Sequence, residues 1–213
     1  MAGGCDMTDD EFTNVEGFVI RNSEFIRHFS IRHLPSALVR LVCAPFHIMY
    51  QTNEIFAKMP AATAAGLFTH LAENEKELVK ATVDSLAKQR NLRPIFVERK
   101  PKLERFAWMQ EALGRQKNAA VAAHLLQIWL VGAHSKLLCD FLDALGIAHD
   151  EHGTIEELPA APDKAKLTIA VDAIFAQHDP SVAAVYLHAF QATDEHGWPS
   201  LEELLATDAR LKL

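Results

Sequence analysis

Apolar residues recur every three or four positions along almost the whole chain, which is the period of an amphipathic helix. After residue 74, for example, Val79, Val83 and Leu86 fall on one helical face. The alternation typical of a half-buried strand is absent apart from the short segment Ile95–Val97. The pattern therefore predicts an all-α fold, a compact multi-helix bundle of about eight to ten helices.

Capping residues, prolines and glycines place the ends of these helices. Thr8-Asp-Asp-Glu11 has the capping-box pattern and predicts a first helix, and Pro35 suits the first turn of a second. Gly114 and Gly146 are expected to end helices, and Gly132 is expected to bend the most apolar one. Further helices are predicted over Asn53–Met59, Ala61–Glu73, Lys102–Leu113, Asp163–Phe175 and Asp179–Gln191. Two more are expected to begin after the capping residues Asn74 and Asn118, and a last short helix is expected to begin at Pro199.

Length and composition favour a single domain. The chain has 213 residues, of which 49% are apolar, so it is long enough to bury a core without disulfides or metals. Pro94 and Pro101 push the residues before them out of helical space, so residues 91–101 are predicted to be an extended linker. We expect one all-helical domain, 1–213, with a subdivision near 91–101 into helical halves 8–90 and 102–213 as the alternative.

The distribution of charge changes what the net charge of −7 means. The segment from Lys88 to Arg105 contains seven basic residues and two glutamates, so this block carries a net charge of +5 and the rest of the chain −12. The acidic total argues against a general nucleic-acid binder, which needs a basic face. Within the block, we select as candidate contacts to an anion or an acidic partner Arg93, Arg99, Lys100 and Lys102. The alternative is an ordinary solvated loop between helices.

Cysteine usage and hydropathy favour a cytoplasmic protein that does not cross a membrane. The three cysteines lie far apart and form no CxxC motif, as expected for reduced intracellular thiols. The N-terminus is acidic and lacks the basic and apolar regions of a signal peptide. The longest apolar stretch, Ala119–Ala133, is shorter than the ~20 residues that cross a bilayer.

Among the eleven histidines, the densest cluster is His149-Asp-Glu-His152. Imidazole and carboxylate groups are ligands for divalent metals, so His149, Asp150 and His152 are candidate metal ligands. The cluster follows Gly146 and is therefore expected in a loop, where no helix fixes the two imidazoles on one face. A solvated polar turn is the alternative, and the HExxH spacing of zinc enzymes is absent.

A second group of candidates lies on the predicted apolar helix after Asn118. His134 falls on a stripe formed by Leu130, Leu137 and Phe141, where an imidazole can contact a bound haem or small apolar ligand. We include His124 and Trp129 in this candidate site, although His124 lies about 80° from His134 around the helix. A histidine at the edge of the core, bonded to a backbone carbonyl, is the alternative.

One tetrad occurs twice. Asp150-Glu-His-Gly153 follows the predicted helix end Phe141–Leu145, and Asp194-Glu-His-Gly197 follows Tyr186–Phe190. The spacing of 44 residues lies in the range of helical repeats, so a pair of repeated helix-loop-helix units is possible in the C-terminal half. Chance similarity between two glycine-closed turns is the alternative.

These observations favour a binding protein over an enzyme. No nucleophile elbow, phosphate loop or dinucleotide-binding motif is present, and the sequence identifies no cofactor. We expect a cytosolic protein-interaction or regulatory module that contacts a protein partner or a second copy of itself, and neither nucleic acid nor a membrane. The alternatives are a helical bundle that holds a small apolar ligand or a haem-like cofactor, and a metal-dependent enzyme that uses the His149–His152 loop.

Overall fold

The computed structural model describes residues 50–155, 157, 159–193 and 197–213. By its internal contacts the chain divides into two units, Met1–Cys43 and Ala44–Leu213, and every described residue belongs to the second. The two helices predicted to open at Thr8 and Pro35 lie outside the described residues.

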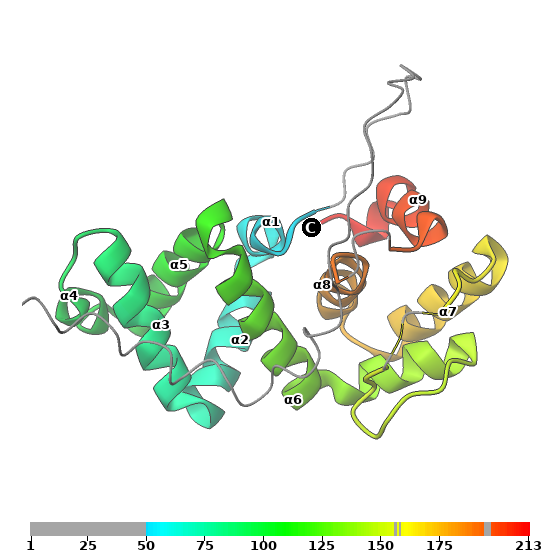
Figure 1. Ribbon diagram of the computed structural model, residues 1–213, viewed down its shortest axis with the longest axis horizontal. Coiled ribbons are helices and arrows are strands. Elements are labelled where there is room, and N and C mark those ends of the chain that lie inside the picture. The colour runs from blue at the N-terminus through cyan, green and yellow to red at the C-terminus, as the bar shows by residue number, and fades with distance from the viewer. Residues whose placement is uncertain (1–49, 156, 158, 194–196) are drawn as a thin grey trace, which may run out of the picture. The chain divides into compact units, whose positions relative to one another are not determined.

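The described residues form nine α-helices, two short 3₁₀ helices and no strand, which confirms the predicted all-α fold (Figure 1). The elements are α1 (Thr52–Lys58), α2 (Ala61–Asn74), α3 (Lys76–Gln89), α4 (Pro94–Glu98), α5 (Lys102–Leu113), η2 (Gln116–Asn118), α6 (Ala119–Leu145), α7 (Lys164–Gln177), α8 (Pro180–Gln191), α9 (Pro199–Thr207) and η3 (Ala209–Leu211).

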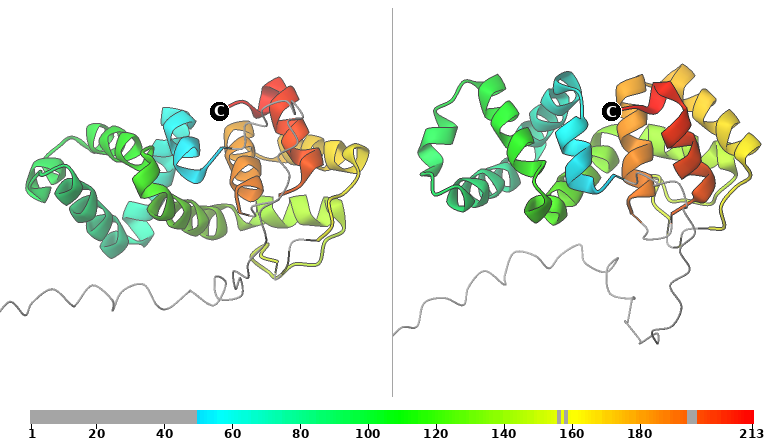
Figure 2. Two further views of the ribbon diagram at one scale, coloured as in Figure 1. Left: turned by 45° about the horizontal axis from the view of Figure 1, so that its top comes forward. Right: turned by 90° about the horizontal axis from the view of Figure 1, so that it is seen from above.

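Helix α6 is shared by two groups of helices. It contacts α1, α2 and α5 as well as α7 and α8, and α9 packs on α7 and α8. Figures 1 and 2 show one group, α1–α5, at one part of α6 and the other group, α7–α9, at the other part. Ten α6 side chains, from Ala122 to Leu145, are buried by these neighbours, which explains why this is the most apolar segment of the chain.

By length and composition alone, the segment Gln116–Leu145 also qualifies as a helix able to cross a membrane. The core helix of a globular protein meets the same criterion, and α6 packs against helices on both of its parts. The expectation that the protein does not bind a membrane stays a prediction.

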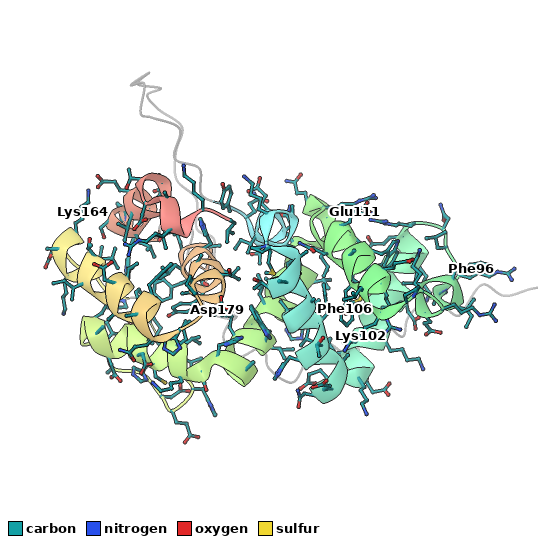
Figure 3. All side chains as sticks on the ribbon, turned by 180° about the vertical axis from the view of Figure 1, so that it is seen from behind. Phe96, Lys102, Phe106, Glu111, Lys164 and Asp179 are labelled. Atoms are coloured by element: carbon teal, nitrogen blue, oxygen red, sulfur yellow. The ribbon has the colours of Figure 1, made fainter. Side chains whose placement is uncertain are left out.

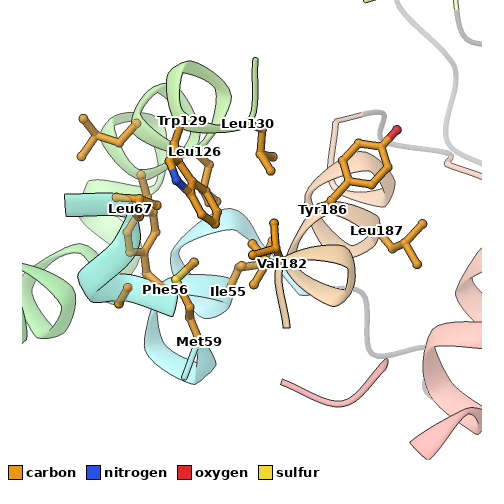
Figure 4. Packing of buried hydrophobic residues seen from close by; sticks show 14 of the residues in the cluster. Ile55, Phe56, Met59, Leu67, Leu126, Trp129, Leu130, Val182, Tyr186 and Leu187 are labelled. Atoms are coloured by element: carbon orange, nitrogen blue, oxygen red, sulfur yellow. The ribbon is translucent and has the colours of Figure 1, made fainter. Parts of the chain in front are cut away.

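The core continues from one helix group into the other. On α1, Ile55 and Phe56 are fully buried, between α6 on one side and Val182 of α8 on the other (Figure 4). Aromatic rings pack together in both helix groups. In the N-terminal group, the ring centroids of Phe68 and Phe106 lie 5.4 Å apart. In the C-terminal helices, Phe190 lies 4.8 Å from Trp198, which is buried in the core rather than held at the surface.

Two helices end in the Schellman motif, in which a residue with positive φ reverses the chain. Asn91 (φ 54°) follows α3, and the Leu92 amide donates to the Ala87 carbonyl at 2.9 Å. Gly146 (φ 66°) follows α6 in the same way, and the Ile147 amide donates to the Leu142 carbonyl at 2.9 Å. The predicted stop at Gly146 is therefore confirmed.

The structure corrects the predicted extended segment at Ile95–Val97, which forms helix α4. Arg93 is extended (φ −75°, ψ 130°), as its position before a proline requires, but it serves as the N-cap. Pro94 occupies the first helical position, where its missing amide is not needed. The restriction before each proline therefore acts on one residue and leaves the following residues free to form a helix.

Two local predictions on α6 also differ from the structure. Asn118 is the N-cap, as predicted, but its side chain makes no cap hydrogen bond and instead donates to the Ala112 carbonyl of α5 at 2.6 Å. The bend expected at Gly132 lies two residues later, at His134, whose backbone is non-helical (φ −131°, ψ 24°).

Residues on both sides of the 91–101 segment are packed together. Helix α3 contacts α4 and α5, and α5 contacts α1, α2 and α6. The segment therefore connects helices of one packed group within the unit Ala44–Leu213. Because residues 1–49 lie outside the described part, the single domain 1–213 stays a prediction.

Candidate functional site

Most of the large apolar side chains that remain exposed are gathered in one short stretch. Five such side chains are found among the described residues, and four lie between positions 92 and 103: Leu92 (41% exposed), Ile95 (44%), Phe96 (58%) and Leu103 (71%). The fifth is Ile169 on α7. We call these four residues, together with Arg93, Arg99, Lys100 and Lys102, the α4 surface.

Local sequence features fix this surface. The Schellman motif at Asn91 turns the chain after α3, and Pro94 then starts α4 within three residues. Val97 is 1% exposed and attaches the short helix to the core, so its neighbours Ile95 and Phe96 point away from that attachment. Phe96 lies at the periphery of the described helices (Figure 3).

The basic side chains of the α4 surface are largely free of internal ion pairs. Within the described part of the chain, Arg93 and Arg99 make no ion pair or side-chain hydrogen bond, and both residues are exposed. Lys100 lies 3.8 Å from Glu104, a solvent-exposed pair of small energetic value. The Lys102 ammonium lies 5.6 Å from the Phe106 ring centroid. Two guanidinium groups are thus available to an anionic partner.

Charge is also polarised along the chain. Residues 50–118 contain twelve Lys and Arg against eight Asp and Glu, whereas residues 119–213 contain five against fourteen. The α4 surface therefore belongs to the basic half of the unit Ala44–Leu213, and an acidic half accompanies it. Such a distribution attracts an acidic segment to one region only.

The predicted metal cluster at His149–His152 forms an internally bonded turn. The Asp150 carboxylate accepts the amides of His152 (2.9 Å) and Thr154 (2.8 Å) and the Thr154 hydroxyl. These bonds, led by the Thr154 hydroxyl, lower the pKa of Asp150 to about 2. Gly153 (φ 72°) closes the turn against α6. The carboxylate thus serves the loop itself, as an Asx turn.

Both nitrogens of His149 have partners. Nδ1 lies 2.6 Å from the Asp150 carbonyl and Nε2 lies 3.2 Å from the Asp143 carboxylate. The hydrogen bond to the carbonyl, with help from Asp143, raises the pKa of His149, so its protonated form is favoured. His152 is exposed, with Nε2 3.6 Å from Glu151. Among the described residues, no group of three or more His, Cys, Asp or Glu side chains is arranged to hold a metal ion.

The three residues of the candidate ligand site are placed differently from one another. Trp129 is buried in the core, among Leu67, Leu126 and Leu130 (Figure 4), and its ring meets that of His134 edge-on at 4.7 Å. His134 is half-buried at the kink of α6, whereas His124 is exposed. The structure therefore brings Trp129 and His134 together and leaves His124 apart from them on the helix surface.

The two DEHG segments share a turn glycine, but the residues after them differ in structure. Gly153 and Gly197 both have positive φ (72° and 46°). The segment after the first tetrad is a loop at residue 157, whereas the segment after the second forms α9. Residues 194–196 of the second tetrad lie outside the described residues. The pair of repeated helix-loop-helix units stays a prediction.

Sequence reasoning selected the basic residues of the α4 surface but missed its apolar ones. The helical spacing of Leu103 with Phe106, Met109 and Leu113 predicts that Leu103 is buried. It lies in the first turn of α5 and is the most exposed large apolar side chain among the described residues. The available signal was the combination of Ile95-Phe96 with flanking arginines, which is unusual for a linker.

Comparisons with known proteins supply no relative. No family model matches the chain, no curated protein matches it, and no solved structure matches it. The function is therefore inferred from the residues of this chain.

Proposed function

We propose that the protein is a cytosolic protein-interaction module whose α4 surface binds an acidic segment of a partner that also carries apolar side chains. One observation carries the proposal. Four of the five large exposed apolar side chains of the described residues lie within twelve positions, beside two arginines whose side chains have no ion pair or hydrogen bond with any other described residue.

Apolar contact supplies the affinity in this proposal. Several large exposed apolar side chains grouped with basic residues are typical of an interaction site, whereas isolated exposed leucines are ordinary. Phe96 and Leu103 are more than half exposed. Covering the exposed parts of both side chains contributes about 3 kcal/mol before the costs of association.

The arginines supply the preference for an acidic segment. A guanidinium group can bind a carboxylate through two parallel hydrogen bonds, a geometry that a lysine cannot reproduce. Arg93 precedes α4 and Arg99 follows it, so the two lie at opposite ends of the short helix that carries Phe96. An acidic segment laid along α4 meets a positive charge at each end of its apolar contact.

A protein partner fits these features better than a membrane or a nucleic acid. Helices that lie in a membrane interface are long amphipathic elements with a basic face. Helix α4 has only five residues, and the C-terminal half of the chain is strongly acidic. Nucleic-acid binding requires a broad basic face, and apolar side chains are prominent at the α4 surface. The acidic half of a second copy is one form that the partner can take.

The proposal is tested by selecting short peptides from a random displayed library on the full-length protein. We expect the enriched peptides to combine Asp or Glu with aromatic or branched apolar residues. We expect their affinity to fall at least tenfold, which is about 1.4 kcal/mol, for the double variants Phe96→Ser/Leu103→Ser and Arg93→Glu/Arg99→Glu. Peptide affinity should also fall with rising salt concentration.

Matched controls are available on other elements. Ile169→Ser removes the remaining large exposed apolar side chain, and Lys80→Glu/Lys117→Glu reverses two exposed charges outside the α4 surface. Both controls should bind the selected peptides like the unmodified protein. Peptides without acidic residues, or equal losses in the control variants, would refute the proposal. Cosedimentation with phosphatidylserine vesicles that depends on Arg93 and Arg99, without peptide selection, would replace the protein partner with a membrane.

Sedimentation velocity of the full-length protein distinguishes a second copy from another protein. If the partner is a second copy, the unmodified protein should associate with rising concentration at low salt, and the Arg93→Glu/Arg99→Glu variant should stay monomeric. Without such association, the acidic segment belongs to a different protein.

A further inference from the structure

The longest helix is interrupted at one residue. Within α6 the backbone of His134 is non-helical (φ −131°, ψ 24°), and no proline causes this kink. Helix α2 approaches α6 at Gly132, before the kink, whereas Tyr186 of α8 contacts Phe141 and His178 bonds to Asp140 beyond it. A change of angle at this residue therefore moves one helix group relative to the other.

Three imidazoles from three places in the chain surround this kink. His70 comes from α2, His134 is the kink residue, and His178 lies between α7 and α8. The approach of α2 is close, because a Cβ added to Gly132 would lie 3.2 Å from Nε2 of His70. Gly132 thus marks a tight contact of α2 on α6, two residues before the kink.

The other charged groups at the kink are two carboxylates and one lysine. Asp179 faces His134 from the start of α8. Asp140 of α6 accepts hydrogen bonds from Lys136 at 2.6 Å and from His178 Nε2 at 2.8 Å. Burial alone raises the pKa of Asp140, but the Lys136 and His178 hydrogen bonds outweigh this effect and lower it. Asp140 is therefore an anion that already has two partners.

His134 is held in its neutral form at neutral pH. Its burial, followed by the nearby His70 and His178, lowers the pKa of His134, and Asp179 offsets only part of this. The neutral ring packs edge-on against Trp129 at 4.7 Å. Protonation places a cation in this half-buried position, against the Trp129 ring and beside His70 of α2.

His70 is held in place by contacts within α2. Its Nδ1 lies 3.3 Å from the Asn74 side-chain amide, which also donates to the His70 carbonyl at 2.8 Å. These contacts orient the His70 ring, whose Nε2 faces Gly132 of α6.

We propose that the kink at His134 is a pH-responsive joint, in which acidification protonates the half-buried His134 ring and loosens the contact of α2 with α6. At neutral pH the neutral His134 ring packs on Trp129 and the kink angle is fixed. In acid, a cation at His134 lies beside His70 of α2, and the Asp140 carboxylate is already bonded to Lys136 and His178. The joint is independent of the α4 surface and goes beyond the proposed function.

Hydrogen exchange of the full-length protein, measured at pH 7.5 and pH 5.5 and corrected for the intrinsic pH dependence of exchange, tests the joint. We expect amides of the second half of α2 and of α6 near His134 to lose at least tenfold protection in acid. The variant His134→Asn keeps a residue that tolerates the kinked backbone but does not titrate, so it should show a smaller loss. The control His124→Asn, on the same helix but exposed, should behave like the unmodified protein.

A second variant keeps the test decisive if His134→Asn fails to fold. His70→Gln retains an acceptor for Asn74 but removes the imidazole beside His134, and it should also reduce the acid-induced loss of protection. Nuclear magnetic resonance titration of the histidine rings should show His134 titrating below the ordinary histidine range. Unchanged protection of α2 and α6 in acid, an equal loss in both variants, or a His134 that titrates normally would overturn the proposal.

Discussion

Replacing Gly153 with alanine tests whether the DEHG loop is packed against α6 as the structure describes. Gly153 is buried with φ 72°, in the left-handed region that an alanine enters at a cost of about 1–2 kcal/mol. An added Cβ would overlap the Cβ of Leu138 and lie 2.9 Å from the amide nitrogen of Cys139. These are rigid parts of a helix, so the overlap adds a further 1–3 kcal/mol, roughly, as in other overpacked cores.

Two other glycines separate the contributions. Gly146 has the same backbone conformation (φ 66°), but an added Cβ meets nothing nearer than the Lys166 ammonium at 3.7 Å. Gly66 lies within α2 with open space around it. Because alanine also restricts the unfolded chain, we expect Gly66→Ala to stabilise by about 0.5–1 kcal/mol and Gly146→Ala to destabilise by about 1. Gly153→Ala should destabilise by about 2–4 kcal/mol.

Denaturant unfolding followed by circular dichroism at the helical band measures all three variants on one scale. In thermal unfolding, 1 kcal/mol corresponds to about 2–4 °C for a chain of this length, so Gly153→Ala should lower the midpoint by about 10 °C. If Gly153→Ala and Gly146→Ala differ by less than about 1 kcal/mol, the loop does not pack on α6 and the reasoning fails.

Three further predictions concern polar contacts of the C-terminal helices. Thr154→Val should raise the pKa of Asp150 from about 2, because the Thr154 hydroxyl is the main partner that stabilises the ionised carboxylate. The ionised carboxylate contributes stability that is lost as pH falls from about 4 to 2, and in the variant this loss should occur at higher pH. The chemical shift of the Asp150 carboxyl carbon, followed against pH, measures the change. His188 is buried and its Nε2 donates to the Leu211 carbonyl at 2.8 Å. Burial lowers the pKa of His188, so protonation opposes folding as pH falls below about 6.5, and His188→Gln should weaken this acid sensitivity in unfolding experiments. Trp198→Phe removes the indole hydrogen bond to Pro159 and part of the buried ring area. It should lower the free energy of unfolding by about 2–3 kcal/mol in denaturant experiments, and a loss below about 0.5 kcal/mol would contradict the buried position of the ring.

Helix ends were predictable where one residue and its neighbours determine the structure. Residues Lys102–Leu113 form α5 and residues Pro180–Gln191 form α8, with the predicted bounds. Asp179 caps α8 by accepting the amides of Ser181 (2.8 Å) and Val182 (3.2 Å), which the Asp-Pro pair predicts. Such signals act within a few residues, so the sequence is enough to read them.

The same local rules fail where a more distant residue competes. Asn118 occupies the predicted cap position, but its amide reaches the Ala112 carbonyl at the end of α5, a partner that only the packing of η2 against α5 provides. Its Oδ1 is buried and has no hydrogen-bond partner among the described residues. Position was therefore predictable from the sequence, whereas the hydrogen bond depends on tertiary structure.

The candidate site shows the same division. Arg93 and Arg99 were selected from local charge alone, but their lack of internal ion pairs within the described part of the chain follows from where neighbouring helices lie. Leu103 belongs to an amphipathic pattern that predicts burial, and it is exposed because no described helix covers the first turn of α5 at that position. Periodicity identifies the apolar face of a helix, but not how far along the helix a partner extends.

Helix α6 also determines how the unit Ala44–Leu213 can be divided. Each helix group buries its apolar side chains against a different part of this one helix, so neither group retains a complete core without it. Cutting the chain before α6 or after it therefore leaves one fragment with an uncovered apolar face. The two groups are expected to unfold in a single cooperative transition, and separately produced fragments should acquire stable structure only when they are mixed.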